Sequence, residues 1–484
     1  MSPTSILIVI VVYFLFLFIV SYLTNRKADN QTFFVGNHKS PWYLVAIGMV
    51  GASLSGVTFV SVPGWVLGSK FYYMQMVMGY GLGYVTIVYV LLPIYYRMNL
   101  TSIYTYLEQR FGKVSYKTGA SLFLVSRIIG ASFRLFLVAN VLQITIFNSF
   151  HVPFFVTVLI TLALIWLYTF KGGIKTIVWT DTLQTLLMLS ALGFTIFFIT
   201  KQMNLSFSAM VAGIKSNELS TMFNFSNWRS GSFFMKQFLS GAFITIVMTG
   251  LDQDMMQKNL SCRNIKDAQK NMLSYAAAFL PVNLLFLSLG VLLVMFAQQF
   301  NLSLPERSDD LFPMVVTSGI LPPVVSLLFV LGLIAAAYSS ADSALTALTT
   351  SFTIDILGIE GKKEDEIKKT RIGVHLLMTS LLFFVILIFN AISNESIISS
   401  LFKAAGYTYG PLLGLYALGI FTKYKINDNY VPIVAIASPI ICYVINSFSE
   451  ALLNGYKFGF EILILNGVLT FFGLLLILDK RRKI

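Results

Sequence analysis

Charge, cysteine and histidine are scarce in this sequence. Asp, Glu, Lys and Arg make up 11% of its 484 residues, whereas an ordinary soluble domain carries about 25%. The two cysteines and three histidines lie far apart along the chain, without zinc-ligand spacing or a disulfide framework. An enzyme would need a nucleophile with a base, or a metal cluster, and these scattered residues supply neither. We therefore expect no catalytic residues and no bound cofactor.

Apolar residues, by contrast, are abundant and occur in long runs. They account for 56% of the chain, and the mean hydropathy is +0.78. The first run, residues 6–23, has neither a basic leader nor a small-residue cleavage site, so we interpret it as a transmembrane helix and not as a signal peptide. A helix of roughly 20 residues crosses about 30 Å of hydrocarbon. The sequence predicts an all-α integral membrane protein in contact with the lipid bilayer.

Thirteen segments are long and apolar enough to be membrane-spanning helices. They cover about residues 4–24, 42–68, 72–96, 118–147, 153–170, 177–200, 235–251, 271–298, 322–353, 372–390, 396–421, 430–448 and 458–478. The polar stretches between them are loop-sized. We therefore expect a single membrane domain over residues 1–484 and no soluble domain.

The basic residues between these segments indicate an orientation. An odd number of spans puts the termini on opposite sides. With the C-terminus inside, most of the 34 Lys and Arg residues fall in cytoplasmic loops, Lys258 and the run at 480–483 among them. Cytoplasmic loops are enriched in Lys and Arg, so we predict an N-terminus outside and a C-terminus inside. This distribution explains the formal net charge of +13 without a nucleic acid partner.

The second predicted helix contains many small residues. Its segment "GMVGASLSGVTFVSVPG" (48–64) has weak helix propensity. An unwound turn near 53–56 would free backbone carbonyls, and a cation is one partner for them. Close helix packing through small residues is the alternative, and this segment alone favours it.

The ninth predicted helix carries hydroxyls and a carboxylate in the stretch "IAAAYSSADSAL" (334–345). Ala336, Ser339, Ser340 and Ser343 are spaced by three and four and share one stripe, with Asp342 on or beside it. Such hard oxygen donors suit a cation such as Na⁺. Serines bonded back to the preceding turn are the alternative, and that reading leaves Asp342 without a partner.

Few other charges lie inside the predicted helices, where each costs about 2.5 to 3.5 kcal/mol. Asp181 lies just inside the cytoplasmic end of its helix and either shares a site with Asp342 or reaches the interface. Arg127 and Arg134 share one helix face, and Arg134, near mid-helix, is the better candidate for an anionic ligand. Lys403 lies near the outer surface and can extend to it.

Six segments, spread over most of the chain, together resemble one family. They are "SLSGVTFVSVPG" (53–64), "LTSIYTYLEQRFG" (100–112), "GGIKTIVWTDTLQ" (172–184), "DQDMMQKNL" (252–260), "AAAYSSADSAL" (335–345) and "GPLLGLYALGIFTK" (410–423). The family is that of the sodium:solute symporters, and its sialic acid and sugar symporters are the most similar in motif.

The resemblance implies a LeuT-type architecture of two inverted five-helix repeats. One additional helix precedes the repeats and two follow them. On this scheme residues 1–40 hold the additional first helix and its loop, 41–200 the first repeat, 235–421 the second repeat and 422–484 the two C-terminal helices. The thirteen predicted spans fit this arrangement, and inverted repeats are a basis of alternating access.

The resemblance also implies binding sites. The shared sodium site would use Gly51, Leu54, Ala336, Ser339 and Ser340. A possible second cation site would use Asp181, Ser339, Asp342 and Ser343, although relatives with such a site have serine where Asp342 stands. The substrate cavity would be lined by Ser53, Ser55, Thr58, Tyr80, Arg134, Gln237 and Ser240, with Lys403 and Tyr407 as further contributors.

The expected function is secondary active transport of a small polar solute with Na⁺. A carboxylated solute such as sialic acid, a related sugar or a monocarboxylate is the leading expectation, with Na⁺ as coupling ion and no other cofactor. A proton-coupled carrier using Asp342 and Asp181, and a Na⁺-coupled carrier of a neutral sugar or inositol, are the alternatives. We expect a multi-pass protein of the cell membrane, specifically a bacterial inner membrane, that functions as a monomer.

Overall fold

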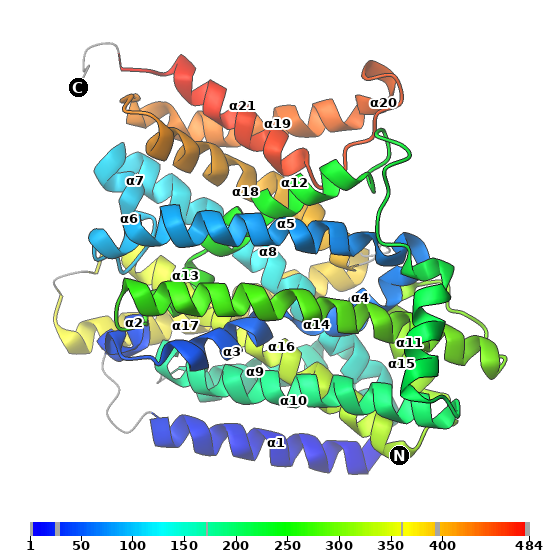
Figure 1. Ribbon diagram of the computed structural model, residues 1–484. Helices are drawn as coiled ribbons and strands as arrows, with labels where there is room; N and C mark the ends of the chain where they lie inside the picture. Colours follow the sequence, from blue (N-terminus) through cyan, green and yellow to red (C-terminus); the bar gives the residue numbers. More distant parts are fainter. Residues whose placement is uncertain (1–2, 25–29, 171–172, 360–361, 393–396, 480–484) are drawn as a thin grey trace.

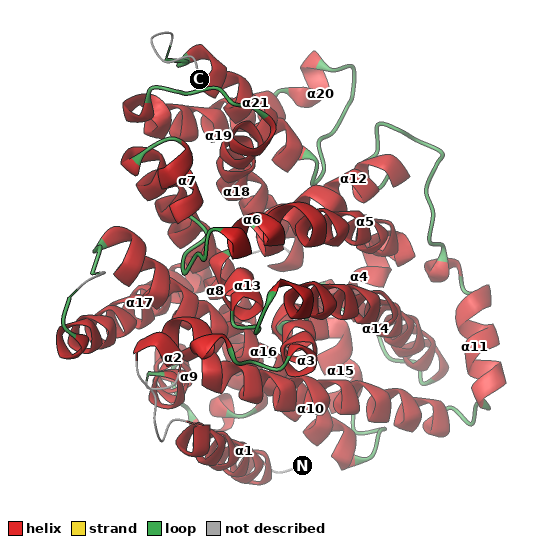
Figure 2. Ribbon diagram, turned by 60° about the vertical axis from the view of Figure 1, so that its left-hand side comes forward, coloured by secondary structure: helices red, strands yellow, loops and turns green. Residues whose placement is uncertain are grey.

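A computed structural model gives the structure of residues 3–24, 30–170, 173–359, 362–392 and 397–479. These described residues form helices joined by loops and contain no β-strand, as Figure 2 shows. The basic run at 480–483 lies outside the described residues. The all-helical fold expected from the sequence is confirmed.

Each predicted span coincides with a helix or with consecutive helical pieces. These are α1 (Pro3–Thr24), α3 (Trp42–Ser53) with α4 (Gly56–Ser69), α5 (Tyr73–Thr86) with η3 (Ile87–Leu91) and α6 (Leu92–Arg97), α8 (Lys113–Thr145), α9 (Phe154–Thr169), α10 (Gly173–Gln202), α12 (Phe234–Thr245) with η6 (Ile246–Gly250), α14 (Ile265–Gln299), α16 (Pro323–Ser351), α17 (Glu364–Ile392), α18 (Ile397–Phe421), α19 (Val431–Ser447) and α21 (Ile462–Leu476). Short helices that the sequence analysis did not mark lie between them: α2 (Asn30–Val35), α7 (Thr105–Arg110), α11 (Phe207–Ser216), α13 (Gln253–Leu260), α15 (Leu311–Thr317) and α20 (Ser449–Leu452).

By length and apolar composition, eight helices of the described chain can cross a membrane, or nine if one bent pair counts as a span. Three shorter apolar helices are Trp42–Ser53, Phe154–Thr169 and Ile462–Leu476. Broken and short helices therefore account for part of the difference from the thirteen predicted spans. The protein is an all-helical membrane protein.

The second predicted span is broken near residues 53–56, where the sequence allowed for an unwound turn. Helix α3 ends at Ser53, and α4 begins at Gly56. Between them Leu54 (φ −82°, ψ 67°) and Ser55 (φ −66°, ψ 174°) leave the helical conformation. Carbonyls at the end of a helix have no partner within that helix, so this break presents acceptors inside the bundle.

A second break, which the sequence analysis did not identify, separates α12 and its π-helical turn η6 from α13. The two parts are bent by 63°. Asp252 is extended (φ −110°, ψ 121°), and its carboxylate caps α13 by accepting from the amides of Asp254 at 2.9 Å and Met255 at 3.4 Å. An aspartate N-cap stabilises a helix start, so α13 begins independently of α12.

Around these two breaks, each broken helix packs against the helix that follows the other broken helix in the chain. Helix α5 lies along α12, while α14 lies along α3 and α4, as Figure 1 shows. Glycine permits the closest approaches: a Cβ on Gly79 of α5 would collide with the carbonyl of Phe238 in α12, and one on Gly290 of α14 with the carbonyl of Pro63 in α4. Small residues allow helix backbones to approach in this way within membranes.

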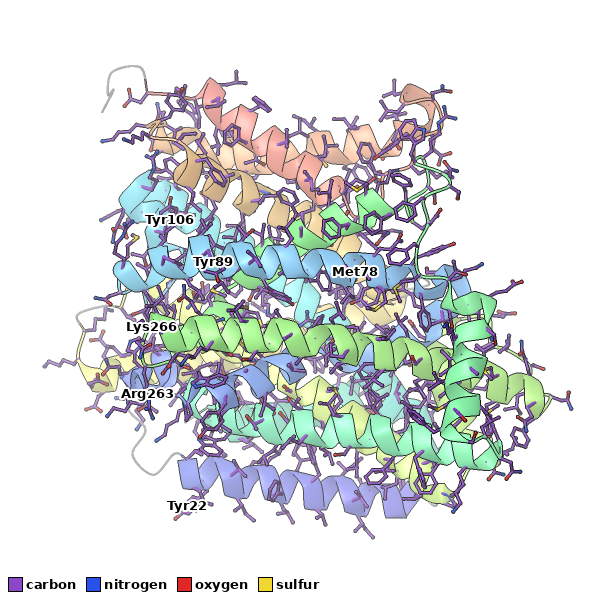
Figure 3. All side chains as sticks on the ribbon, viewed as in Figure 1. Tyr22, Met78, Tyr89, Tyr106, Arg263 and Lys266 are labelled. Atoms are coloured by element: carbon purple, nitrogen blue, oxygen red, sulfur yellow. The ribbon has the colours of Figure 1, made fainter. Side chains whose placement is uncertain are left out.

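Burial grades from the centre of the bundle to its rim. In α16, 72% of the residues in its most apolar 18-residue stretch are buried. In the corresponding stretch of α1, 22% are buried. Apolar side chains on the rim face outward, among them Tyr22 of α1 and Tyr89 of the α5 span, which are 66% and 64% exposed and are labelled in Figure 3. Exposed apolar side chains on long helices suit a lipid environment. The polar stretch of α16 therefore lies at the centre of the bundle, away from lipid.

Candidate functional site

The serines of α16 face the break between α3 and α4. Ser339, Ser340 and Ser343 are all buried. The Ser340 hydroxyl donates to the carbonyl of Ala52 in the last turn of α3 at 3.0 Å, and it also lies 3.3 Å from the carbonyl of Ala336 one turn back. The predicted stripe therefore contacts the broken helix directly. Serine hydroxyls and helix-end carbonyls from two distant segments meet at this point.

Asp181 lies on α10, beside the same serine stripe. Its carboxylate accepts hydrogen bonds from Ser339 Oγ at 2.7 Å and from Ser343 Oγ at 3.3 Å. The side chain is fully buried, so it does not extend to the membrane interface. Burial disagrees with the interfacial reading of Asp181, and its hydrogen-bond donors are serines of α16. A site shared with Asp342 stays a prediction.

A lysine completes this cluster. Lys258 Nζ on α13 lies 2.8 Å from Asp181 Oδ2, and the lysine side chain is 1% exposed. Our assignment of Lys258 to a cytoplasmic loop is therefore wrong. The segment looked like a loop because it is polar, but its charges are neutralised by partners on other helices and not by water.

Asp342 points to a different neighbour. Its carboxylate accepts from the Tyr168 hydroxyl of α9 at 3.0 Å and from the backbone amide of Ser343 at 2.6 Å. Within the described part of the chain, no Lys or Arg forms an ion pair with it. The carboxylates of Asp181 and Asp342 thus flank the serine helix and use different hydrogen-bond donors.

An ion-pair network continues from Lys258 along α13. Lys258 Nζ is 4.0 Å from Asp254 Oδ1. The Arg127 guanidinium pairs with Asp254 and lies 3.6 Å from Asp252, which also accepts from the Tyr409 hydroxyl at 2.5 Å. Asp252 and Asp254 are two further buried carboxylates, which the sequence analysis did not identify.

A cavity opens beside the broken helix on the side of the Arg127 and Arg134 guanidinium groups. It holds about 710 Å³ of empty space, counting its open mouth. Its polar and aromatic lining comprises Ser53, Ser55, Thr58, Tyr73, Tyr80, Tyr84, Arg127, Arg134, Thr245, Thr249, Tyr275, Phe279 and Phe402. The predicted substrate-binding residues Ser53, Ser55, Thr58, Tyr80 and Arg134 all line this cavity.

The tyrosines form an ordered wall of the cavity. Tyr275 donates to Ser53 Oγ at 2.7 Å, and Tyr84 donates to the Tyr275 hydroxyl at 2.9 Å. Tyr73 and Tyr80 approach within 3.4 Å through their hydroxyls. Phenol groups held in this way present both an apolar ring and a hydrogen-bonding tip. The sequence analysis identified only Tyr80 of this group. Tyr73 and Tyr84 lie on the same helix α5 and could have been found from its seven- and four-residue spacings, whereas Tyr275 lies on α14 and reaches them only in the tertiary structure.

The two arginines differ in their partners. Arg127 is paired with Asp252 and Asp254, whereas Arg134 forms no ion pair among the described residues, and its Nε is buried without a hydrogen-bond partner. A guanidinium is always charged and prefers planar oxyanions. The cavity therefore carries one positive charge that the surrounding protein does not pair.

Four other predicted substrate contacts lie outside the cavity lining. Gln237 donates to the carbonyl of Gly231 at 2.7 Å. Ser240 is buried in α12 and is not among the residues of the cavity lining. Tyr407 accepts from Asn446 at 2.8 Å, and Lys403 is exposed.

Comparison with known proteins identifies the family. Residues 33–429 match the family model described as "Sodium:solute symporter family". The chain belongs to this family. It is 28% identical over 458 residues to the sodium/sialic acid symporter NanT of Aliivibrio fischeri, across 90% of this chain and 86% of the relative. It is 25% identical over 422 residues to the sodium/sialic acid symporter SiaT of Proteus mirabilis, across 83% and 81%.

Solved structures show the same fold. A Na⁺-coupled sialic acid symporter, solved in a substrate-bound outward-open state, matches with a TM-score of 0.82 at 20% identity over 99% of both chains. Mhp1, a nucleobase-cation-symport-1 family transporter, matches with a TM-score of 0.56 at 14% identity over 93% of this chain and 94% of the other.

As a member of the sodium:solute symporter family, the protein is a Na⁺-coupled symporter of a small organic solute and not an enzyme. It is a multi-pass membrane protein, and two of its relatives are sodium/sialic acid symporters of bacteria. Symport requires an ion site and a solute site that influence each other. In this symporter the serine stripe and the cavity adjoin the same broken helix, with Ala52 and Ser53 as consecutive residues.

Proposed function

We propose that this symporter carries a carboxylated, polyhydroxylated solute of the sialic acid type. The observation that supports this most directly is Arg134, a guanidinium without an ion-pair partner in the described protein, in the lining of the cavity. A carboxylate accepts two parallel hydrogen bonds from such a group. Serine, threonine and tyrosine hydroxyls around it suit the hydroxyls of a sugar-like solute.

The sodium site is proposed at the meeting point of the broken helix and the serine stripe. Its ligands would be the backbone oxygens of Gly51, Leu54 and Ala336 and the hydroxyls of Ser339 and Ser340. The contact of Ser340 with Ala52 supports this proposal, because it brings the two walls to hydrogen-bonding distance. Ser339 adds to it: a hydroxyl that donates its proton to Asp181 directs its lone pairs elsewhere.

We further propose thirteen spans, with an N-terminus outside and a C-terminus inside. The described start of α1 and end of α21 lie at opposite ends of the bundle in Figure 1, which supports an odd number. Arg263 and Lys266, labelled in Figure 3, lie at the end where α21 finishes. Basic residues are enriched in the cytoplasm, so this end is proposed as cytoplasmic.

The two repeats are proposed at 41–200 and 235–421, following residues 1–40 and preceding 422–484. Both proposed repeats begin with a broken helix, at 54–55 and at 251–252. The exchanged packing of α5 on α12 and of α14 on α3 and α4 also supports an approximate two-fold relation. A single chain contains both sites, so we propose that the monomer is the functional unit.

The test is uptake of radiolabelled N-acetylneuraminic acid into proteoliposomes that contain the purified protein. An imposed Na⁺ gradient at fixed pH is compared with a K⁺ gradient and with a proton gradient. We expect Na⁺-dependent uptake, reduced at least about tenfold in Arg134→Ala, since losing a charge-assisted pair costs about 1.5 to 3 kcal/mol. Competition by pyruvate, glucose and inositol distinguishes acidic from neutral solutes. Unchanged uptake in Arg134→Ala, or displacement by glucose or inositol alone, would refute the carboxylate assignment.

A further inference from the structure

The cluster around Asp181 contains a positive charge of the protein itself. We infer that the Lys258 ammonium fills the second cation site, so that this symporter binds one Na⁺ and not two. This inference rests on the proposed sodium site at Gly51, Leu54, Ala336, Ser339 and Ser340. It concerns a different position, the space on the Asp181 side of the serine stripe.

Lys258 is the counter-ion of Asp181, a proposed ligand of the second cation site. Its Nζ lies 2.8 Å from Asp181 Oδ2. The same carboxylate accepts from Ser339 and Ser343, which are the hydroxyls expected to surround a second cation. The ammonium therefore adjoins the oxygen set that would otherwise coordinate Na⁺.

Burial makes this ion pair costly to break. The lysine side chain is 1% exposed and that of Asp181 is fully buried. A buried charge without a partner is very costly, so each of these groups requires the other. Replacing the ammonium by Na⁺ would strand a buried lysine unless it found a second carboxylate.

The nearest second carboxylate is already occupied. Asp254 Oδ1 is 4.0 Å from Lys258 Nζ, but Asp254 pairs with Arg127. Lys258 and Asp254 lie one turn apart on α13, a spacing at which side chains meet. Lys258 lies closer to Asp181, at 2.8 Å, than to Asp254, at 4.0 Å, so the geometry favours the pair with Asp181.

Asp342 does not provide the missing charge for a second Na⁺ at this position. Its carboxylate accepts from Tyr168 of α9 and from the amide of Ser343, while the hydroxyls of Ser339 and Ser343 serve Asp181. On the Asp181 side of the stripe, Lys258 already neutralises the carboxylate that would attract a second ion.

The ammonium differs from a coupling ion in one respect. A Na⁺ ion enters from outside and leaves inside, so its gradient drives transport. A lysine is tethered and cannot cross, so it supplies charge to the site but no driving force. The tethered cation should hold Asp181 in position for Ser339 and thereby maintain the proposed sodium site.

Equilibrium binding of radioactive Na⁺ to the purified full-length protein tests the inference. We expect about one Na⁺ per wild-type protein at saturation. Lys258→Met removes the charge while keeping a similar apolar stem, and it should bind about two. Lys258→Arg should remain at one. Lys266→Met, at an exposed lysine of α14, is the matched control and should also remain at one.

Lys258→Met leaves Asp181 without a counter-ion and can therefore fold poorly. A second measurement, of thermal stability, tests the inference in that case. The melting temperature of this variant in Na⁺ and in K⁺ is compared with that of the wild type. The inference expects a larger Na⁺ stabilisation in the variant, because Na⁺ replaces the ammonium. An equal Na⁺ stabilisation in both proteins would contradict it.

The outcomes separate this inference from the proposed function. Two Na⁺ in the wild type, or one Na⁺ in well-folded Lys258→Met, would overturn the tethered cation and leave symport intact. Absence of any Na⁺ binding by the wild type would instead overturn the proposed sodium site.

Discussion

The hydroxyl of Ser340 in α16 donates a hydrogen bond to the carbonyl of Ala52 in α3 at 3.0 Å. The two residues are separated by 288 positions in the chain, and both are buried. One belongs to a polar stripe in a long helix and the other to the last turn before a helix break. Their contact joins the two segments between which we propose that Na⁺ binds.

Removing the stripe hydroxyls should weaken Na⁺ binding. Ser339→Ala and Ser340→Ala each delete one proposed oxygen ligand, and we expect the Na⁺ concentration for half-maximal uptake to rise about tenfold in each. This corresponds to about 1.4 kcal/mol, within the range for one lost polar interaction. Ser380→Ala, at an exposed serine of α17, is the control. Full activity of the double variant at low Na⁺ would disprove the assignment.

The approach of α3 to α10 should depend on Gly51. A Cβ at this position would collide with the Thr185 hydroxyl of α10. We expect Gly51→Ala to lower stability by about 1 to 3 kcal/mol, the usual cost of overpacking, and to abolish most Na⁺-dependent uptake. Melting temperature and transport are both measured.

Two variants check the steric reason for that loss. Gly193→Ala on α10 has open space around its added methyl group, so it should melt at or above the wild-type temperature. Thr185→Ala in the Gly51→Ala background removes the colliding hydroxyl and should recover part of the stability. No recovery would show that the collision is not the cause.

Arg127, which pairs with Asp252 and Asp254, should stabilise the folded protein. Arg127→Met leaves Asp252 and Asp254 buried without their base, and breaking a buried ion pair costs about 3 to 5 kcal/mol. We expect a marked fall in melting temperature. The double variant Arg127→Met with Asp254→Asn leaves fewer uncompensated charges and should regain much of it. Arg263→Met, at an exposed arginine, should melt as the wild type does.

Substitutions of Tyr168 and Asp342 should have non-additive effects on stability, and neither should change the number of Na⁺ ions that bind. Tyr168→Phe removes the donor at 3.0 Å and should destabilise the protein by about 1 to 3 kcal/mol, the cost of an unsatisfied buried acceptor. In an Asp342→Ser background the same change should cost much less. Asp342→Ser alone should leave Na⁺ stoichiometry unchanged, and a gain or loss of one ion would show that Asp342 is a cation ligand.

Local patterns were sufficient to predict much of the fold. Apolar runs of helical length marked the main helices to within eight residues at either end, because burial in lipid selects composition over the whole run. The break at Leu54 was also predictable, since serines and glycines weaken the helix at that point. The serine stripe followed from helical spacing alone.

Segment 252–260 could not be interpreted in this way. Its polar residues have the composition of a cytoplasmic loop, yet Lys258 and Asp254 are buried in α13. Local composition does not distinguish a solvated charge from one neutralised by a distant partner. The break before Asp252 was missed for the same reason, because polar residues after an apolar helix ordinarily mark its end.

The sequence by itself determined that this chain is a helical membrane protein, where its apolar helices lie, and that oxygen donors line one side of a central helix. These properties depend on residues close together in the chain. Only the tertiary structure decided that Asp181 faces Lys258, that Asp342 faces Tyr168, and that Arg134 lines a cavity without an ion-pair partner in the described protein. Each of these depends on helices far apart in sequence, and packing alone determines which charges meet.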